Sequence, residues 1–383
     1  MGRRYLPCHW QGVTKNVRVL VFTTWFPDSE NQATAPFNLK HVQAIAAQHD
    51  VRVIHVRLGG SGDVISENYG AVPVTRIPLS PRRPLGYLAM ARQLWAALWQ
   101  TDVLHTMAFS SAVIAAPVQA FKRTRWVHTE HWSGMANPAS VSKLWVVFSP
   151  LRYVLKLPDA VTAVSAAQAD QLSRFARGGR VEVVPNVVQG PDALATRQGM
   201  PDGAPRLVGV GGLIARKRPM LALEALRLVR AGGLDATLTL VGDGPLRAEL
   251  ESAAAAANLG GKFTITGLVA PDQVSAALRA ADLFILPSSH ETFCVSAAEA
   301  VAAGLPAIVT DLPAVRDFLT VRNSVLVAGD SAEDFAAGIH DALAKFSQVS
   351  PATISGTIAS RYAPRVIADK FSAVYARVRG AGG

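Results

Sequence analysis

Cysteine is scarce in this sequence, and charged side chains are fewer than in most globular proteins. Cys8 and Cys294 are the two cysteines, so the chain offers neither a disulfide framework nor a CxxC metal motif. Charged residues make up 17% of the 383 residues and hydrophobic residues 50%, a balance that argues against disorder and supports well-buried cores. Two cysteines without a pairing pattern also favour a reducing cytoplasm.

Long apolar runs are also missing. Arg3 and Arg4 are followed by no apolar segment, so we expect neither a signal peptide nor a twin-arginine signal. The longest stretch without charge, residues 103–121, is near the lower length limit for crossing a bilayer. Because it contains His105 and Pro117, we interpret it as a strand, a loop and a helix rather than a membrane span.

Positive charge is concentrated in the first half of the chain. Residues 1–190 contain 20 Lys and Arg against 10 Asp and Glu, whereas residues 191–383 contain 18 of each. This imbalance suggests an anionic partner such as a membrane surface, a lipid phosphate or an acidic glycan. A soluble enzyme from a proteome of high pI is the alternative. Nucleic acid is disfavoured because the basic residues are scattered rather than gathered on one helix.

Strand-like apolar runs alternate with Ala-rich helical runs, which predicts an α/β protein with mostly parallel sheets. The length predicts two domains. Composition changes at residues 189–205, which hold three prolines and three glycines with little apolar periodicity. We therefore expect an N-terminal domain over residues 1–190, a linker over 191–205 and a second domain over 206–363.

The expected elements follow from apolar periodicity and from start and stop signals. The segment 84–99 is a basic, aromatic, amphipathic helix that could pack on a sheet or touch a membrane. An irregular stretch is expected before the last helix. The other expected strands are 17–22, 51–56, 102–105, 125–128, 160–164, 181–184, 206–210, 236–241, 263–266, 283–286 and 307–310, and the other helices are 37–48, 219–231, 246–258, 271–280, 295–303 and 366–378, with one more after Ser165 as its cap.

A glycine-rich loop, residues 209–218, lies between a predicted strand and a predicted helix. Glycines let a backbone approach a phosphate, and the helix N-terminus adds N–H groups and positive potential. Lys217, flanked by Arg216 and Arg218, adds full positive charge. Ile214 stands where the dinucleotide fingerprint needs a small residue, so a hydride-transfer cofactor is disfavoured. The residues alone leave open a phosphate site or a purely structural turn.

Two further segments carry acidic residues. Asp243, in the turn over residues 242–245, is interpreted as a helix-capping side chain rather than a catalyst. Glu291 and Glu299 are eight residues apart, so both can reach one ligand only if Glu291 lies in a loop before the helix. A carboxylate there could accept hydrogen bonds from vicinal sugar hydroxyls. The alternative is two surface glutamates flanking an apolar helix.

These segments resemble family 4 glycosyltransferases, and the resemblance extends from Val17 nearly to the end of the chain. Its most specific element is the pair of glutamates separated by seven residues. The resemblance implies the GT-B fold, in which two Rossmann-like α/β/α domains have parallel sheets facing an interdomain cleft. The matching segments are 208–217, 240–250, 263–269, 280–306 and 325–339 in the second half, and 102–106, 128–134, 160–170 and 181–186 in the first.

The resemblance also implies roles for single residues. Lys217 would bind the donor diphosphate, Glu291 the hydroxyls of the transferred sugar and Glu299 the ribose. His131 would lie under the sugar, which makes His131, Lys217 and Glu291 the expected catalytic residues. The expected donor-binding residues are Gly211, Gly212, Arg216, Lys217, Gly267, Leu268, Val269, Glu291, Thr292, Phe293, Cys294, Val295 and Glu299.

The chain departs from the family pattern at three places. Gly212 stands where many members have arginine, and Arg216 is the candidate to supply that charge. Cys294 stands where many members have glycine, which would tighten the sugar pocket. The N-terminal loop lacks the paired glycines of many members, so residues 34–37 have no assigned donor contact.

The resemblance implies a retaining glycosyltransferase that moves a hexose from a UDP- or GDP-sugar to an acceptor hydroxyl. The N-terminal domain would bind a sugar, lipid-linked or small-molecule acceptor, and a helix at 364–380 would pack back onto it. No DxD motif or His/Asp cluster calls for a metal, so we expect no metal and no cofactor. The expected place is the cytoplasm or the inner membrane face. The alternatives are a nucleotide-sugar epimerase of the same fold and a non-catalytic partner protein.

Overall fold

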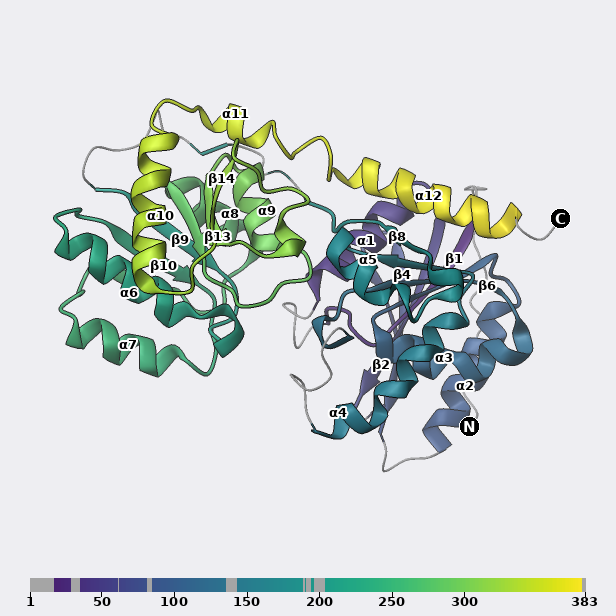
Figure 1. The fold of residues 1–383 in the computed structure, drawn as a ribbon. Coiled ribbons are helices and arrows are strands. Elements are labelled where there is room, and N and C mark those ends of the chain that lie inside the picture. Colours follow the sequence, from purple (N-terminus) through teal and green to yellow (C-terminus); the bar gives the residue numbers. More distant parts are fainter. Residues whose placement is uncertain are drawn as a thin grey trace. The chain divides into compact units, whose positions relative to one another are not determined.

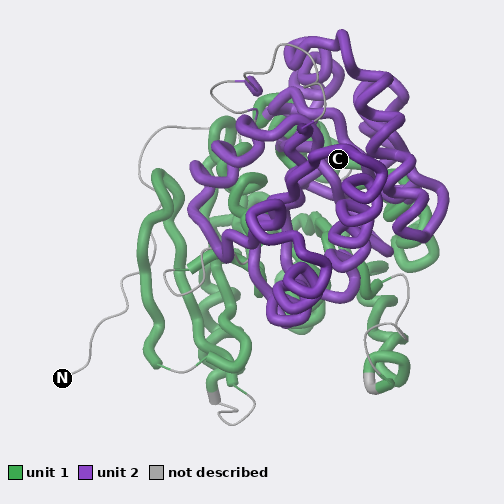
Figure 2. The backbone as a smooth tube through the Cα atoms, turned by 90° about the vertical axis from the view of Figure 1, so that its left-hand side faces the viewer, with its two compact units in different colours: residues 1–187, 364–383 green, residues 188–363 purple. Residues whose placement is uncertain are grey.

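A computed structural model describes residues 17–28, 35–60, 62–80, 85–135, 143–188, 190, 194–195 and 204–380. The chain forms two compact units, shown in two colours in Figure 2. Unit 1 consists of residues 1–187 and 364–383, and unit 2 consists of residues 188–363. Most of the expected linker, residues 191–205, lies outside the described residues.

Unit 1 is built on an eight-stranded sheet in the order β3-β4-β2-β1-β5-β6-β7-β8. Its strands pair in parallel, except that β3 pairs antiparallel with β4 at one edge. Central strands are continuous apolar runs because both of their faces are covered. The strands are β1 (Arg18–Thr23), β2 (Asp50–Leu58), β3 (Ile65–Tyr69), β4 (Val72–Leu79), β5 (Val103–Met107), β6 (Arg125–Glu130), β7 (Ala160–Ala163) and β8 (Val181–Val183).

Helices cover both faces of this sheet (Figure 1). On one face α1 and α12 pack on a core that contains Val21 and Val53. On the other face α2, α3 and the 3-10 segment η3 pack on a core that contains Leu20 and Leu104. The longer helical elements are α1 (Pro36–Ala46), α2 (Leu85–Leu98), α3 (Phe109–Lys122), α4 (Lys143–Phe148), η3 (Ser149–Lys156), α5 (Ala166–Ser173) and α12 (Pro364–Gly380).

The C-terminal helix α12 belongs to unit 1 although unit 2 precedes it in the sequence. Phe371 and Tyr375 are buried against the sheet. The Tyr375 hydroxyl lies 2.7 Å from Nδ1 of His105 on β5, and the Ser372 hydroxyl lies 2.7 Å from Nε2 of His49. Polar contacts inside an apolar interface therefore fix the register of α12 on unit 1.

Unit 2 has a six-stranded, all-parallel sheet in the order β11-β10-β9-β12-β13-β14. The chain builds outward from β9 to β11 and then returns to place β12 on the other side of β9. In open parallel sheets, ligands bind outside the carboxyl ends of the strands at such a switch point. The strands are β9 (Arg206–Val210), β10 (Thr237–Val241), β11 (Phe263–Ile265), β12 (Leu283–Leu286), β13 (Ala307–Thr310) and β14 (Ser324–Val327).

The helices of unit 2 begin and end near the start and stop signals of the sequence. Ala303 caps the end of α9, and Gly304 follows with φ 91°, the stop signal expected from the sequence. Five elements, β9, α6, α8, β12 and β13, have the predicted bounds. The helices are α6 (Pro219–Ala231), α7 (Arg247–Ala256), α8 (Pro271–Ala280), α9 (Val295–Ala302), α10 (Ala332–Lys345) and α11 (Pro351–Ser355), and a 3-10 turn, η5 (Ala215–Lys217), precedes α6.

Several regions carry elements that the prediction left out, among them α4 and η3. The edge hairpin of β3 and β4 was not expected. The stretch before the last helix is not irregular, because it contains β14, α10 and α11. Helix α10 begins with a capping box in which Ser331 Oγ accepts from the Asp334 N–H and Asp334 Oδ2 accepts from the Ser331 N–H.

The charge-free stretch 103–121 is β5 followed directly by α3, with Ala108 between them. The expected strand and helix are confirmed, whereas the expected loop between them is reduced to Ala108. Across the part of the chain that the structure describes, no helix combines the length and apolar character needed to cross a membrane. Ser165 caps α5 as predicted, since its side chain accepts a hydrogen bond from the Gln168 N–H at 3.2 Å.

Candidate functional site

Two loops of unit 2 meet at the switch point between β9 and β12. The Ser289 N–H donates to the Arg216 carbonyl at 2.9 Å, and the Ser289 hydroxyl donates to the same oxygen at 3.2 Å. The Arg216 guanidinium in turn donates to the His290 carbonyl at 3.3 Å. The loop after β9 and the loop after β12 are therefore hydrogen-bonded to each other.

Lys217 and Glu291 face each other across these two loops. Nζ of Lys217 donates to Oε1 of Glu291 at 2.6 Å. The side chains are 16% and 8% exposed, so the pair is largely shielded from water. Charge-assisted hydrogen bonds of this kind are among the strong ones. The sequence predicted both residues as site residues, and the structure brings them into direct contact.

The glycine turn of the first loop packs tightly on the turn after β10. A side chain at Gly242 would place its Cβ 2.1 Å from the carbonyl oxygen of Gly211, so only glycine fits there. A cavity of about 20 Å³, large enough for one water molecule, lies at this turn, and Gly211, Gly212 and Lys217 are among its lining residues. Three of the expected donor-binding residues thus surround one point at the carboxyl end of β9.

Arg218 fixes the position of the Lys217 loop. Its backbone is left-handed, with φ 48°, an uncommon conformation for a side chain of this size. Its guanidinium donates to the Pro287 carbonyl at 2.5 Å and to the Thr310 hydroxyl at 3.1 Å, and it also pairs with Asp330. The sequence suggested Arg218 as further positive charge for a phosphate, whereas the structure engages it with the loops after β12 and β14 and with the last residue of β13.

The loop before α9 places the two glutamates as the spacing required. Glu291 precedes α9 by several residues, and Glu299 lies in the second turn of the helix. Thr292 and Val295 are half-buried beside them. The Phe293 side chain is buried against Phe318, with ring centroids 4.9 Å apart, so only the backbone of Phe293 is available to a ligand.

Cys294 caps the N-terminus of α9 in a left-handed conformation, with φ 72°. Its thiol is buried, and burial together with the nearby Glu291 carboxylate raises the thiol pKa to about 12. The thiol therefore stays neutral near pH 7 and is not a nucleophile.

The expected base-binding segment, Gly267 to Val269, follows β11. Gly267 pairs with Gly242 through an isolated antiparallel bridge, and the Leu268 side chain is exposed. Asp243 is not a helix cap, because α7 begins after Leu246 without a side-chain cap. Its carboxylate instead accepts from the Gly244 N–H at 2.8 Å and from Arg247 at 3.0 Å, which holds the turn.

His131 lies in unit 1, directly after β6. Its ring is 4.6 Å from Phe37 and 5.3 Å from His41, centroid to centroid. Burial holds the pKa of His131 well below its usual range, so the imidazole is neutral at physiological pH. Neither of its buried ring nitrogens has a hydrogen-bond partner within the described ranges. Such a group is available to a bound ligand.

Glu130 shapes the turn that presents His131, and sequence analysis missed it. Its buried Oε1 accepts from the N–H groups of His131 and Trp132, both at 2.8 Å. Oε2 lies 3.3 Å from Nε2 of His128. A carboxylate at the end of a buried strand was the available signal, because such a group must find partners.

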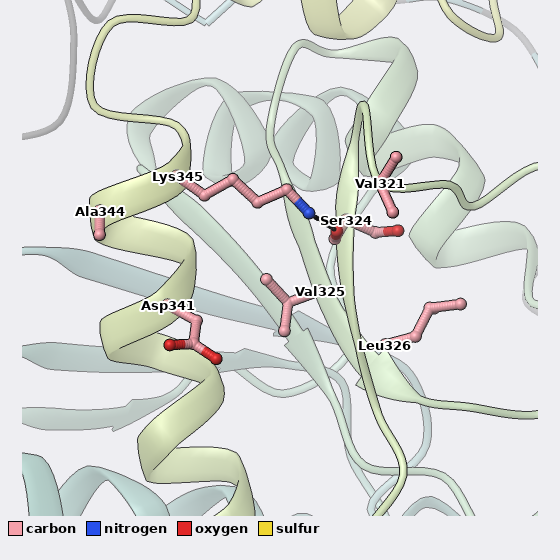
Figure 3. Close-up of a pocket in the computed structure, with 7 residues that line it drawn as sticks. All are labelled: Val321, Ser324, Val325, Leu326, Asp341, Ala344 and Lys345. Atoms are coloured by element: carbon pink, nitrogen blue, oxygen red, sulfur yellow. Dashed lines mark hydrogen bonds between the residues drawn. The ribbon is translucent and has the colours of Figure 1, made fainter.

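A hollow of about 680 Å³ lies elsewhere in unit 2, between β14 and α10 (Figure 3). Ser324, the first residue of β14, lines it, so it lies toward the amino end of that strand rather than at the carboxyl edge that carries Lys217 and Glu291. Its lysine, Lys345, donates to the Ser324 carbonyl at 3.2 Å. We therefore do not assign this open hollow to the donor site.

No three His, Cys, Asp or Glu side chains of the described residues come together as metal ligands. The positive charge at the switch point of unit 2 comes from Lys217, with Arg216 beside it. The two loops therefore present positive charge beside the Glu291 carboxylate. This arrangement suits a ligand in which an anionic group lies next to several hydroxyl groups.

Comparisons with known proteins identify the family of the chain. Residues 37–189 match the family model described as Glycosyltransferase Family 4, and residues 204–345 match the model described as Glycosyl transferases group 1. The 2-deoxystreptamine glucosyltransferase of Streptomyces kanamyceticus is 30% identical over 274 residues, which are 63% of this chain and 70% of that protein. The chain belongs to glycosyltransferase family 4. A GDP-mannose-dependent alpha-mannosyltransferase of Mycolicibacterium smegmatis is 29% identical over 202 residues, 52% of this chain and 51% of that protein.

Solved structures confirm the predicted GT-B fold of this family 4 enzyme. Sucrose-phosphate synthase from Thermosynechococcus elongatus superposes with a TM-score of 0.75 at 19% identity, covering 96% of this chain and all of that one. The Anabaena protein HepE, solved with UDP and glucose, gives 0.73 at 15% identity and covers 94% of this chain and 99% of its own. Family membership makes the chain a nucleotide-sugar-dependent hexosyltransferase, as predicted, and does not favour the epimerase or the non-catalytic alternative.

Proposed function

We propose that the enzyme transfers a hexose from a UDP- or GDP-sugar to an acceptor hydroxyl with retention of anomeric configuration. The Lys217–Glu291 contact at the switch point of unit 2 carries this proposal. A nucleoside diphosphate offers Lys217 a partner of higher charge than one carboxylate, and sugar hydroxyls offer Glu291 hydrogen-bond donors. We expect donor binding to separate the pair, with Lys217 on the diphosphate and Glu291 on the sugar.

The leaving diphosphate is the group that needs stabilisation in the transition state. Lys217 and backbone N–H groups at the start of α9 would stabilise its developing negative charge. The bond between the anomeric carbon and the phosphate oxygen breaks while the acceptor oxygen bonds to that carbon on the same face. The acceptor proton passes to the leaving phosphate oxygen, so no separate general base is required.

The remaining proposed contacts with the donor come from the loops around Lys217 and Glu291. Glu299 would accept hydrogen bonds from the ribose, and the segment Gly267 to Val269 would lie against the base. The backbone of residues 292–295 would line the sugar and phosphate, because the Phe293 side chain is committed to the core. Arg216 lies beside Lys217 and would add charge near the phosphates, which compensates for Gly212 where many members have arginine.

No metal ion or other cofactor is part of this proposal, since the lysine ammonium supplies the charge that a divalent cation would otherwise supply. His131 of unit 1 would hydrogen-bond the transferred sugar through a neutral imidazole nitrogen that has no partner among the described residues. Unit 1 would hold the acceptor.

The names of relatives and the charge of the first half of the chain support a proposal for the acceptor class. One relative is named for 2-deoxystreptamine and another for a phosphatidylinositol mannoside. We propose a sugar, small-molecule or lipid-linked acceptor, in glycan, glycolipid or glycosylated-metabolite synthesis. We further propose that the enzyme works in the cytoplasm, at the inner face of the membrane.

The test compares Lys217→Met and Glu291→Gln with the wild type in hexose transfer from UDP-glucose, UDP-N-acetylglucosamine and GDP-mannose. Both variants should lose transfer by at least about 100-fold, Lys217→Met because it removes a group that stabilises developing charge and Glu291→Gln because it removes the carboxylate that positions the sugar. Lys262→Met is the matched control, because Lys262 also pairs with a carboxylate in unit 2, that of Asp235, but away from the switch point. Full activity of either site variant would overturn the assignment.

Three further measurements test the anomeric configuration of the product, the need for a metal and the epimerase alternative. The anomeric configuration of the product, read by NMR, should match that of the donor, and inversion would reject the retaining route. Activity should persist in excess EDTA, and its loss with recovery on adding a divalent cation would reject metal independence. Epimerised donor formed without any acceptor would establish the epimerase instead.

A further inference from the structure

Helix α2 is apolar on two opposite sides. Its inner side, with Met90, Leu94 and Leu98, is buried against the sheet of unit 1. Its outer side carries Leu88, and Trp99 follows directly after its last residue; the two side chains are 68% and 67% exposed. Water-facing sides of helices in soluble proteins are normally polar, so this outer side calls for an explanation.

The exposed apolar residues of α2 form one stripe. Leu88, Arg92, Trp95 and Trp99 are separated by four, three and four residues, the spacing that places side chains on one helix face. Tryptophan and arginine on one face combine apolar area with a polar or charged tip. This combination is suited to the boundary between water and lipid.

The end of α3 extends this stripe. Phe121 is 81% exposed, and Nζ of the adjacent Lys122 lies 3.5 Å from the centre of the Trp99 ring. Helices α2 and α3 pack side by side on the same face of the unit 1 sheet (Figure 1). The stripe and Phe121 therefore belong to one continuous surface.

The segment of α4 and η3 adds a second group of exposed apolar residues. Val147 is 71% exposed, and η3 packs against α3 on the same face of the sheet. We call the outward side of these four elements the helical face. Its exposed apolar residues are Leu88, Trp95, Trp99, Phe121, Val146, Val147, Phe148 and Leu151.

The charge of the helical face has one sign. Residues 85–101, 103–129 and 143–158 contain no Asp or Glu. Basic residues are interleaved with the apolar ones, namely Arg92, Lys122, Lys143 and Lys156. A surface of this composition is complementary to an anionic bilayer, because basic residues are attracted to its negatively charged headgroups and apolar residues to its acyl layer.

We propose that the helical face of unit 1 docks the enzyme on an anionic lipid bilayer. Tryptophan, phenylalanine and valine side chains enter the headgroup boundary, and the basic residues contact lipid phosphates. Docking places α4, which follows the carboxyl end of β6 and His131, near the lipid. Easier access to a lipid-linked acceptor is a consequence that rests on the proposed function. The docking itself does not depend on that function.

The test measures sedimentation of the full chain with vesicles of phosphatidylcholine, with and without phosphatidylserine. Wild type should sediment with the anionic vesicles, blue-shift its tryptophan emission and be released by high salt. The double variant Trp99→Ala, Phe121→Ala should bind at least about tenfold more weakly, since it removes two side chains that would enter the lipid. Lys156→Glu should also weaken binding.

Matched controls come from other surfaces. Val321→Ala removes an equally exposed apolar residue from unit 2, and Lys370→Glu reverses an exposed charge on α12, which covers the other face of the unit 1 sheet. Both should bind vesicles like wild type. The proposal is overturned if wild type ignores anionic vesicles, if the face and control variants bind alike, or if the face variants change only self-association in light scattering.

A thermal-shift assay with nucleoside diphosphates separates this inference from the proposed function. The face variants should keep the stabilisation that a diphosphate gives to wild type. A face variant that loses vesicle binding but still binds the diphosphate supports the docking and leaves the donor site unaffected. Wild type that binds vesicles but no diphosphate contradicts the donor site and not the docking.

Discussion

Lys217 and Glu291 carry opposite charges in a place where water has little access. Each side chain compensates the desolvation of the other, so the removal of one leaves a shielded charge without its partner. We expect Lys217→Ala to lower the free energy of unfolding by about 3 kcal/mol, in addition to its effect on transfer. Urea unfolding followed by far-UV circular dichroism measures this change.

The double variant Lys217→Met, Glu291→Gln is the control for that prediction. It removes both charges and keeps similar side-chain volumes, so it should recover most of the lost stability while remaining inactive. If Lys217→Ala and the double variant unfold at the same urea concentration, the pair contributes nothing to the stability of the site.

At the residue scale the sequence named Lys217 and Glu291 as candidate site residues but could not show how they contact one another. Lys217 and Glu291 were predicted by motif, yet their contact depends on two loops 74 positions apart. Arg218 and Glu130 could not be assigned their positions, because they bind backbone carbonyl and N–H groups whose directions only the fold determines.

At the scale of elements, α12 is held on unit 1 by a buried polar contact within an apolar interface. Tyr375→Phe removes the hydroxyl beside Nδ1 of His105 and leaves that nitrogen without its partner. We expect a loss of about 1–3 kcal/mol in the stability of unit 1, the usual cost of an unsatisfied buried polar group. Tryptophan fluorescence during urea unfolding measures it.

The control for this prediction is Tyr87→Phe, since the Tyr87 side chain is exposed. Removing its hydroxyl should leave the urea midpoint unchanged. Equal destabilisation by both variants, or none by Tyr375→Phe, would show that the contact with His105 does not stabilise α12.

Helices and strands were predictable wherever the sequence marks their extent or their ends. Strands buried on both faces are continuous apolar runs, and α6, α8 and α9 begin or end at Pro or Gly. The β3–β4 hairpin was missed because prolines at 73 and 78 lie within β4, which is paired on both sides, and proline argues against a strand in that position. Helix α10 was missed although Ser331 and Asp334 form its capping box.

At the scale of the molecule, buried histidines make unit 1 sensitive to acid. Burial lowers the pKa of His41 to about 4, and burial with the Arg76 charge lowers that of His55 to about 4, both in unit 1. Their ordinary value is 6.5, so below that pH the unfolded state binds more protons than the folded state. The stability of unit 1 should therefore fall from about pH 6.5 to about pH 4, by roughly 3 kcal/mol for each histidine.

Tryptophan emission tests this directly, because all seven tryptophans lie within the residues assigned to unit 1. The urea midpoint read by tryptophan emission should be clearly lower at about pH 5 than at about pH 7.5. His41→Gln should flatten part of this dependence. A midpoint that does not move between the two pH values would contradict the assignment of neutral buried histidines.

Unit 1 consists of two segments that are far apart in the sequence, and this affects how the enzyme folds during synthesis. Residues 364–380 complete unit 1, but the ribosome reaches them only after the whole of residues 188–363. At ~5–20 residues per second, that interval lasts on the order of ten to thirty-five seconds. Throughout it, one apolar face of the first sheet still waits for α12 and is open to chaperones.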